Sequence, residues 1–173
     1  MNVIQSGELP REAILGKYKQ EGAYTDCYFI DIPRAVSQAA YVEVFYTTKL
    51  FKIERLVLAL LARRPSTDAQ ARLLALGETQ SFAVWSVEGR TSDQLLLCDF
   101  LGSTRSWLMS AVIKGENSST TRLYFGSAVV PKIDRASGRA SFGIAFHMLL
   151  GFHRLYSRAL LRSAHSRLLY SAR

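Results

Sequence analysis

Hydrophobic and polar residues follow two different periods along this chain, and the changes of period divide it into segments. From residue 37 to residue 77 apolar residues recur every three or four positions, which is typical of amphipathic helices. From Ser81 to Val130 aromatic, β-branched and leucine residues form short runs separated by turn residues, which predicts strands. The predicted elements, in order, are a strand at residues 24–32, helices at 38–45, 50–62 and 68–76, strands at 81–88, 94–100, 104–113 and 120–130, and a helix from 141 to about 170.

Local signals predict where two of these helices begin or end. Ser37 is expected to be an N-cap, because its hydroxyl can accept a hydrogen bond from a free amide in the first helical turn. Gly77 is expected just after the helix that opens at Thr67, where the backbone commonly becomes left-handed.

The gaps between the four later strands are too short for parallel crossovers, so these strands should form antiparallel hairpins. A three-residue loop at 101–103 would give one hairpin an ion pair near its turn and an apolar patch behind it. The cross-strand pairs expected from this register are Asp99 with Arg105, Leu97 with Trp107, and Leu95 with Met109.

Strands grouped in a run, rather than alternating with helices, favour an α+β fold over a doubly wound one. We expect an antiparallel sheet of about five strands that grips a long C-terminal helix, with two or three helices between the first strand and the other four. Residues 1–22 are polar and mixed, and are expected to be a lead-in that packs loosely or covers an edge. Residues 23–173 are expected to form a single domain, because no linker or repeat divides them.

The composition is that of an ordinary globular protein. The 173 residues are 49% hydrophobic and 21% charged, which excludes intrinsic disorder, collagen and a disulfide scaffold. The first twelve residues lack the apolar stretch of a signal peptide, and the longest strongly apolar run, residues 56–62, is far too short to cross a membrane. We therefore expect a soluble, cytoplasmic protein in which Cys27 and Cys98 are buried free thiols.

The formal net charge is +8, and nearly all of it lies in the C-terminal part of the chain. From Lys132 onward the sequence contains eight basic residues and one acidic residue. Arg154, Arg158 and Arg162 recur at every fourth position and form a basic ridge on the predicted terminal helix. The ridge is either simply exposed to solvent or contacts an anionic membrane surface, an acidic partner protein or another copy of this chain. Nucleic acid is disfavoured, because the aromatic residues of this helix lie on its apolar stripe.

The order of the elements and one segment of the sequence resemble a known fold family. Strand, helices, a four-strand run and a long terminal helix are similar in order to the START-like superfamily, also called Bet v 1-like or SRPBCC. Residues 152–162, FHRLYSRALLR, resemble the closing helix of a bacterial family of unknown function, whose members also begin with a strand like residues 24–28. The resemblance implies a helix-grip architecture with a cavity between the sheet and the terminal helix, and it implies no particular activity.

The familiar sequence motifs of catalysis and cofactor binding are absent from the chain. The sequence contains no nucleophile elbow, no glycine-rich dinucleotide motif and no phosphate-binding loop. His147, His153 and His165 share one predicted helix, but neighbours among them are not three or four positions apart, so no two can jointly face a metal ion. We therefore expect no metal site, no cofactor and no catalytic set.

His153 lies in the apolar stripe of the terminal helix and should face the sheet. It is either a partly buried histidine satisfied by one hydrogen bond, or a polar anchor for the head group of a ligand in the cavity. The aromatic residues around it either fill the core or line a partly open cavity. The residues expected to contact a ligand are Tyr28, Trp85, Asp99, Arg105, Trp107, Phe125, Phe146, Leu149, His153 and Tyr156.

Three functions follow from these observations, and the sequence favours the first. In the first, the protein is expected to bind a hydrophobic or amphipathic small molecule in the cavity between the sheet and the terminal helix. Alternatively it is a non-catalytic interaction or oligomerisation module that uses its basic helix. A cyclase- or hydratase-like enzyme with a cavity histidine as acid or base is the third reading, and no motif supports it.

Overall fold

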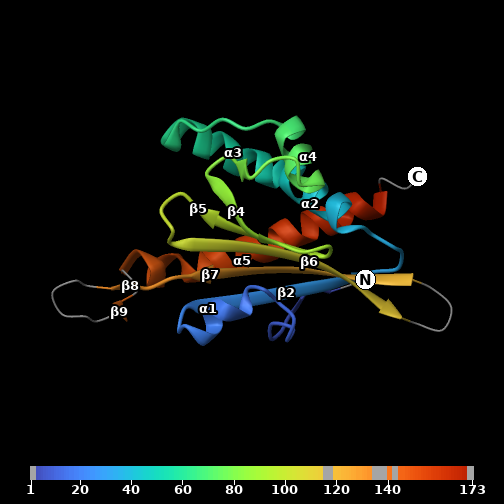
Figure 1. Ribbon diagram of the computed structural model, residues 1–173, viewed down its shortest axis with the longest axis horizontal. Helices are drawn as coiled ribbons and strands as arrows, with labels where there is room; N and C mark the ends of the chain where they lie inside the picture. Colours follow the sequence, from blue (N-terminus) through green and yellow to red (C-terminus); the bar gives the residue numbers. More distant parts are fainter. Residues whose placement is uncertain (1–2, 115–118, 134–139, 142–143, 171–173) are drawn as a thin grey trace.

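An antiparallel sheet and a long C-terminal helix define an α+β fold, as predicted (Figure 1). The structure is a computed structural model that describes residues 3–114, 119–133, 140–141 and 144–170, without the side chains of residues 114, 119, 132–133, 140–141 and 144–152. The strands of the main sheet lie in the order β1-β2-β7-β6-β5-β4-β3, and β8 and β9 form a separate pair. The elements are β1 (Gln5–Ser6), α1 (Gly16–Gln20), β2 (Tyr24–Ile32), α2 (Gln38–Thr47), α3 (Lys49–Ala62), α4 (Asp68–Leu76), β3 (Ser81–Phe82), β4 (Trp85–Arg90), β5 (Gln94–Asp99), β6 (Thr104–Lys114), β7 (Ser119–Val129), β8 (Lys132–Ile133), β9 (Ala140–Ser141) and α5 (Ile144–Tyr170).

The main sheet has seven strands in the described part of the chain, where about five were expected. One extra strand arises because the predicted strand 81–88 is divided into β3 and β4 at Ala83, whose φ of 53° is left-handed. The other is β1, which pairs with β2 at the edge of the sheet. The N-terminal lead-in therefore covers an edge, and it also contributes the buried side chains of Leu15 and Tyr18.

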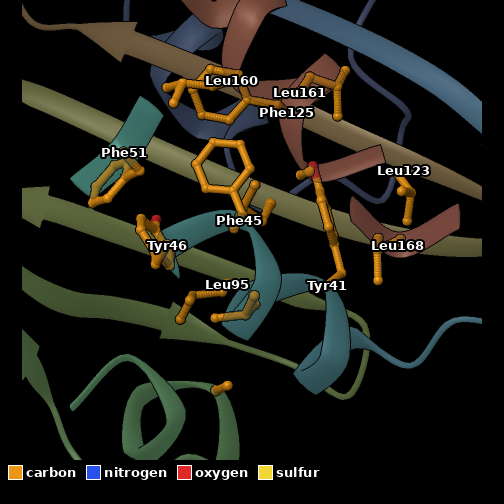
Figure 2. Close-up of a cluster of buried hydrophobic side chains, with 14 of the residues drawn as sticks. Tyr41, Phe45, Tyr46, Phe51, Leu95, Leu123, Phe125, Leu160, Leu161 and Leu168 are labelled. Carbon is orange, nitrogen blue, oxygen red and sulfur yellow. The ribbon is translucent and has the colours of Figure 1, made fainter. Parts of the chain in front are cut away.

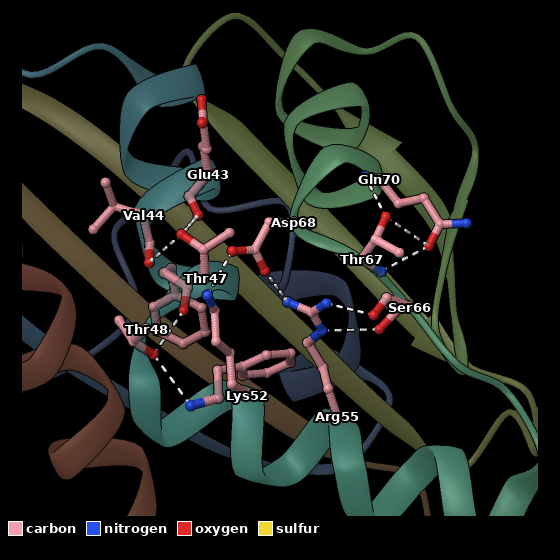
Figure 3. Close-up of polar contacts among 12 residues, drawn as sticks. Glu43, Val44, Thr47, Thr48, Lys52, Arg55, Ser66, Thr67, Asp68 and Gln70 are labelled. Carbon is pink, nitrogen blue, oxygen red and sulfur yellow. Dashed lines mark hydrogen bonds and ion pairs between the residues drawn. The ribbon is translucent and has the colours of Figure 1, made fainter.

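The predicted helix boundaries are confirmed by their capping contacts. The Ser37 hydroxyl accepts a hydrogen bond from the Ala40 amide at 3.2 Å. Thr67 and Gln70 form a reciprocal capping box at the start of α4 (Figure 3). Gly77 ends α4 with a φ of +82°, a conformation that costs glycine little.

The two faces of the sheet carry separate cores. The face that packs against α2 and α5, here called the front face, holds a large cluster in which Phe45 contacts Tyr41, Tyr46, Phe51 and Phe125 (Figure 2). The opposite face, here called the back face, is covered by α1 and the residues around it. Its smaller cluster is built from Ala13, Leu15, Tyr18, Cys27, Leu96, Trp107, Met109 and Ala128.

The register of the β5–β6 hairpin differs by one residue from the prediction, so the predicted cross-strand pairs are wrong. Leu96 is opposite Trp107, and Leu97 is opposite Ser106. The loop contains four residues, 100–103, because the Asp99 carboxylate accepts hydrogen bonds from the Ser103 and Thr104 amides at 2.7 and 3.0 Å. A shift of one residue moves a side chain to the other face of a strand, so Trp107 belongs to the back face and Leu97 to the front face.

Helix α5 runs unbroken from Ile144 to Tyr170, and Gly151 does not interrupt it. At 1.5 Å per residue its 27 residues extend over about 40 Å. The helix contacts β2, β7, α2 and α3, so it closes the front face of the sheet. Its C-terminal half buries Leu160, Leu161, Ala164 and Leu168 in the front core.

Candidate functional site

A cavity of about 300 Å³ lies between the front face of the sheet and helices α3 and α5. That volume is at the lower end of the range for small-molecule sites, about 300–1,000 Å³. Most of the wall is apolar or aromatic. The lining residues are Phe45, Phe51, Glu54, Leu58, Val84, Trp85, Asp99, Phe100, Thr104, Arg105, Ser106, Phe125, Ser127, His153, Tyr156, Ser157 and Leu160.

The structure brings six of the ten predicted ligand contacts to this cavity: Trp85, Asp99, Arg105, Phe125, His153 and Tyr156. Tyr28 and Trp107 do not line it. The side chains of Phe146 and Leu149 lie outside the described residues.

Trp107 is fully buried on the back face, away from the cavity, because of the one-residue shift in register. Its indole Nε1–H donates to Gln94 Oε1 at 2.9 Å, and its ring lies 6.0 Å from that of Tyr124. Gly126 allows this packing, since a Cβ atom there would lie 2.9 Å from Trp107 Cε3. Trp107 is therefore a core residue of the back face.

Arg105 borders the cavity but is not paired with Asp99. Its Nε donates to Glu88 Oε2 and to the Tyr18 hydroxyl, both at 2.8 Å. Burial is the largest single influence on the pKa of Arg105 and lowers it, but the charge and hydrogen bond of Glu88, together with Cys98 and Tyr18, raise the pKa overall. Arg105 is therefore paired with Glu88 on the back face, and this contact replaces the predicted Asp99–Arg105 ion pair.

Two residues of the basic ridge contact tyrosines of β2. Arg154 Nε donates to the Tyr24 hydroxyl at 3.2 Å, and the Arg158 guanidinium lies 5.3 Å from the centre of the Tyr28 ring. Burial raises the pKa of Tyr28 to about 12. This part of the ridge thus packs beside β2, outside the cavity.

His153 is anchored by a polar cluster that the sequence did not reveal. Its Nε2 lies 2.8 Å from Ser127 Oγ and 3.4 Å from Asp26 Oδ2. Ser127 Oγ donates to Asp26 Oδ1 at 2.7 Å, and the Ser127 amide donates to the same oxygen at 3.0 Å. Asp26 and Ser127 are directly paired residues of β2 and β7, so sheet pairing brings this cluster together.

The proton arrangement of this cluster differs from that of a serine hydrolase. The one hydroxyl proton of Ser127 is donated to Asp26, so Ser127 Oγ must accept from a protonated His153 Nε2. In a Ser-His-Asp triad the serine instead donates to the histidine, and the aspartate binds the other ring nitrogen. His153 is therefore positioned as a hydrogen-bond donor and does not activate Ser127 as a nucleophile.

A second polar pair, Glu54 and Tyr156, lies in the cavity wall. The Tyr156 hydroxyl donates to Glu54 Oε2. Burial raises the pKa of Glu54, although the Tyr156 hydrogen bond and the His153 charge oppose that shift. Burial and the Glu54 charge also raise the pKa of Tyr156. The periodicity of the helix does place Glu54 on the same face as Phe51 and Leu58, but nothing local pointed to Tyr156 as its partner.

Replacing Glu54 by glutamine should raise stability at neutral pH and leave it unchanged at low pH. The folded protein holds the Glu54 proton more tightly than the unfolded chain, so wild-type stability falls as pH rises from the ordinary value of 4.5 through the raised folded pKa. Glutamine carries no charge that burial would destabilise, and its side-chain oxygen can still accept a hydrogen bond from the Tyr156 hydroxyl. Urea unfolding of wild type and Glu54→Gln across this pH window measures the difference. The exposed Glu78→Gln is the control, and an equal pH response in all three proteins would contradict the expectation.

Three buried polar atoms near the cavity have no hydrogen-bond partner among the described residues: Trp85 Nε1, Ser157 Oγ and Asp26 Oδ2. Trp85 and Ser157 line the cavity, and Asp26 lies directly behind Ser127 and His153. Leaving such an atom unsatisfied costs about 1–3 kcal/mol. Trp85 Nε1 and Ser157 Oγ are therefore available to hydrogen-bond a molecule that enters the cavity, whereas Asp26 Oδ2 lies 3.4 Å from His153 Nε2.

The described residues contain neither a metal-binding cluster nor a membrane-spanning helix. In the part of the chain that the structure describes, the His, Cys, Asp and Glu side chains form no group of three that could hold a metal ion. None of the helices, taken over their described residues, is both long and apolar enough to span a bilayer.

Comparisons with protein-family models, with curated protein sequences and with solved structures find no match for this chain. The cavity and its polar groups are therefore the basis on which a function can be inferred.

Proposed function

We propose that the protein binds a small amphipathic molecule in the cavity between the sheet and α5, in a START-like helix-grip arrangement. The observation that carries this proposal is the combination of an aromatic wall with buried polar atoms that lack partners. A cavity that served only as a packing defect would be apolar throughout, since buried polar atoms are normally satisfied.

The arrangement of the wall suggests how such a ligand lies. Phe45, Phe51 and Phe125 form a continuous apolar surface, with the three rings in mutual contact through Phe45. His153 and Ser157 come from one side of α5, beside the Glu54–Tyr156 pair. We place the apolar body of the ligand against the phenylalanines and its polar head near His153 and Glu54.

The polar head should carry hydrogen-bond donors. Glu54 presents its carboxyl oxygens at this end, and the Ser157 hydroxyl, which can accept as well as donate, has no hydrogen-bond partner in the described part of the chain. Arg105, which lines the cavity, is already paired with Glu88. An alcohol or amine head therefore fits better than a carboxylate, sulfate or phosphate, which would be repelled by a charged Glu54 carboxylate.

The test is a pair of substitutions at Ser157, a buried cavity residue on α5. Ser157→Leu puts a bulky side chain into the cavity, whereas Ser157→Ala removes the hydroxyl and leaves the space. The neutral fluorophore N-phenylnaphthylamine should brighten on binding to wild type and to Ser157→Ala, and should lose about tenfold or more in affinity for Ser157→Leu. Circular dichroism establishes that both variants are folded.

The head-group preference is tested by competition against the bound fluorophore. Linear alcohols and amines should displace it at lower concentration than carboxylic acids of the same chain length. Failure of wild type to bind the fluorophore or any of these molecules would overturn the proposed function, and equal competition by acids would overturn only the head-group assignment.

A further inference from the structure

Helix α3 has two faces of different character. Phe51, Glu54 and Leu58 point inward and line the cavity. The opposite face is exposed and aliphatic, with side-chain exposures from 46% to 82%. The residues of this outer stripe are Ile53, Leu56, Val57, Leu60 and Leu61.

The outer stripe has the spacing of one continuous helical surface. Relative to Ile53 its members lie at positions 3, 4, 7 and 8, which all fall on one side of an α-helix. Scattered single apolar residues on a surface need no explanation, but a contiguous apolar patch marks an interaction surface. Helix α3 also lies at the outer edge of the molecule (Figure 1).

Basic residues surround the outer stripe. Lys49 and Lys52 lie at the start of α3, and Arg63 and Arg64 follow its end, all four exposed. Residues 49–72 contain six basic and two acidic residues, a net charge of +4. Asp68 is paired with Lys52 and Arg55, and Glu54 faces the cavity, so the positive charge at the border of the stripe is carried by Lys49, Arg63 and Arg64.

The stripe is held facing outward by contacts on the other side of α3 (Figure 3). Arg55 is buried, and its Nε donates to Ser66 Oγ at 3.0 Å. Its Nη1 pairs with Asp68 Oδ1 at 2.6 Å, and the Thr48 hydroxyl caps the helix by accepting from the Phe51 amide at 3.2 Å. These contacts connect α3 to the start of α4 and to the end of α2, so the exposed face is a fixed feature of the fold.

We propose that the outer stripe of α3 docks on an anionic membrane surface. A helix with an aliphatic face bordered by Lys and Arg lies in the plane of a bilayer interface, with its apolar side chains at the acyl boundary and its cations among the lipid phosphates. This docking differs from the basic ridge of α5, where Arg154 and Arg158 contact tyrosines of the protein itself. It is independent of the proposed ligand, although it would place one wall of the cavity directly over the lipid.

A second copy of this chain fits the stripe less well. A two-fold axis perpendicular to α3 would bring Lys49 and Lys52 of one copy beside Arg63 and Arg64 of the other. An axis parallel to α3 would place each cation beside its own counterpart. Both arrangements juxtapose like charges, which destabilise an interface, whereas lipid phosphates neutralise them.

The experiment is co-sedimentation with vesicles of phosphatidylcholine alone or mixed with phosphatidylserine. Wild type should bind the mixed vesicles, and added salt should weaken the binding. Leu60→Asp/Leu61→Asp and Arg63→Glu/Arg64→Glu should each bind about tenfold or more weakly. The matched control is Leu101→Asp in the β5–β6 loop, where Leu101 is 70% exposed, and its binding should be unchanged.

A second measurement reports the contact directly. Leu60→Trp places a fluorophore on the outer stripe, and its emission should shift to shorter wavelength when mixed vesicles are added. Absence of vesicle binding by wild type, or equal binding by Leu60→Asp/Leu61→Asp, would overturn the proposal. A dimer that Leu60→Asp/Leu61→Asp abolishes without any lipid binding would assign the stripe to a second copy. Loss of vesicle binding only in Arg158→Glu/Arg162→Glu would move the contact to α5.

Discussion

Replacing Phe45 by alanine should lower the free energy of unfolding by about 3–5 kcal/mol. Phe45 is 1% exposed and lies at the centre of the front core (Figure 2). Its ring is within 5.0–6.1 Å of the rings of Tyr41, Tyr46, Phe51 and Phe125. Its removal therefore loses both the transfer free energy of one aromatic side chain and the contacts of four others, and it leaves a void that joins the cavity.

Urea or thermal unfolding measures this loss, with Phe100→Ala as the matched control. Phe100 also borders the cavity, but it lies in the β5–β6 loop and is 57% exposed. Its replacement should change stability by no more than about 0.5 kcal/mol. Similar losses in the two variants would show that Phe45 is not the centre of a packed core.

The elements themselves were largely predictable, because their signals are local. Tyr24–Ile32 was predicted with the observed bounds from its aromatic and β-branched residues and the proline that follows. Ser37 and Gly77 act at helix ends through contacts with residues close in sequence, and such contacts can be read from the chain alone. The same holds for the described half of α5, where His153, Tyr156 and Leu160 of the predicted apolar stripe turn toward the sheet.

The register of β5 and β6 was not predictable, because it depends on one loop residue. The sequence suggested a loop of three residues, but the Asp99 carboxylate stabilises a loop of four by accepting from two backbone amides. The choice between these loops reverses the face of every β6 side chain relative to β5. That single difference explains why Trp107 was expected in the cavity and is found on the back face.

The polar half of the candidate site depends on contacts between residues far apart in the chain. His153 was identified because its helix has a regular period. Ser127 is 101 residues from Asp26 and becomes its partner only through the pairing of β2 with β7. Asp26 could have been noticed, since it shares the inward positions of its strand with Tyr28 and Ile30. Its role could not have been predicted, because nothing in the neighbouring sequence shows that Ser127 and His153 contact it.

Replacing Trp107 by alanine should also lower stability by about 3–5 kcal/mol, without changing the cavity. Trp107 is completely buried beneath α1, and its Nε1–H donates to Gln94 Oε1. Gln94 also accepts from the Ile14 amide at 2.9 Å and donates to the Glu12 carbonyl at 3.0 Å, so it connects the N-terminal segment to the sheet. Loss of the indole therefore removes a large apolar side chain and loosens this connection.

Substitutions of Trp85 should have the opposite effects, because Trp85 lines the cavity and Trp107 does not. Trp85 lines the cavity and its Nε1–H has no partner among the described residues, so Trp85→Phe should cost little stability but weaken binding of N-phenylnaphthylamine. Trp107→Phe should retain the affinity of wild type for the fluorophore while losing about 1–2 kcal/mol of stability, because a buried hydrogen bond and part of the packing are lost. Weaker fluorophore binding in Trp107→Phe, with none in Trp85→Phe, would place Trp107 at the cavity and contradict the observed register of β6.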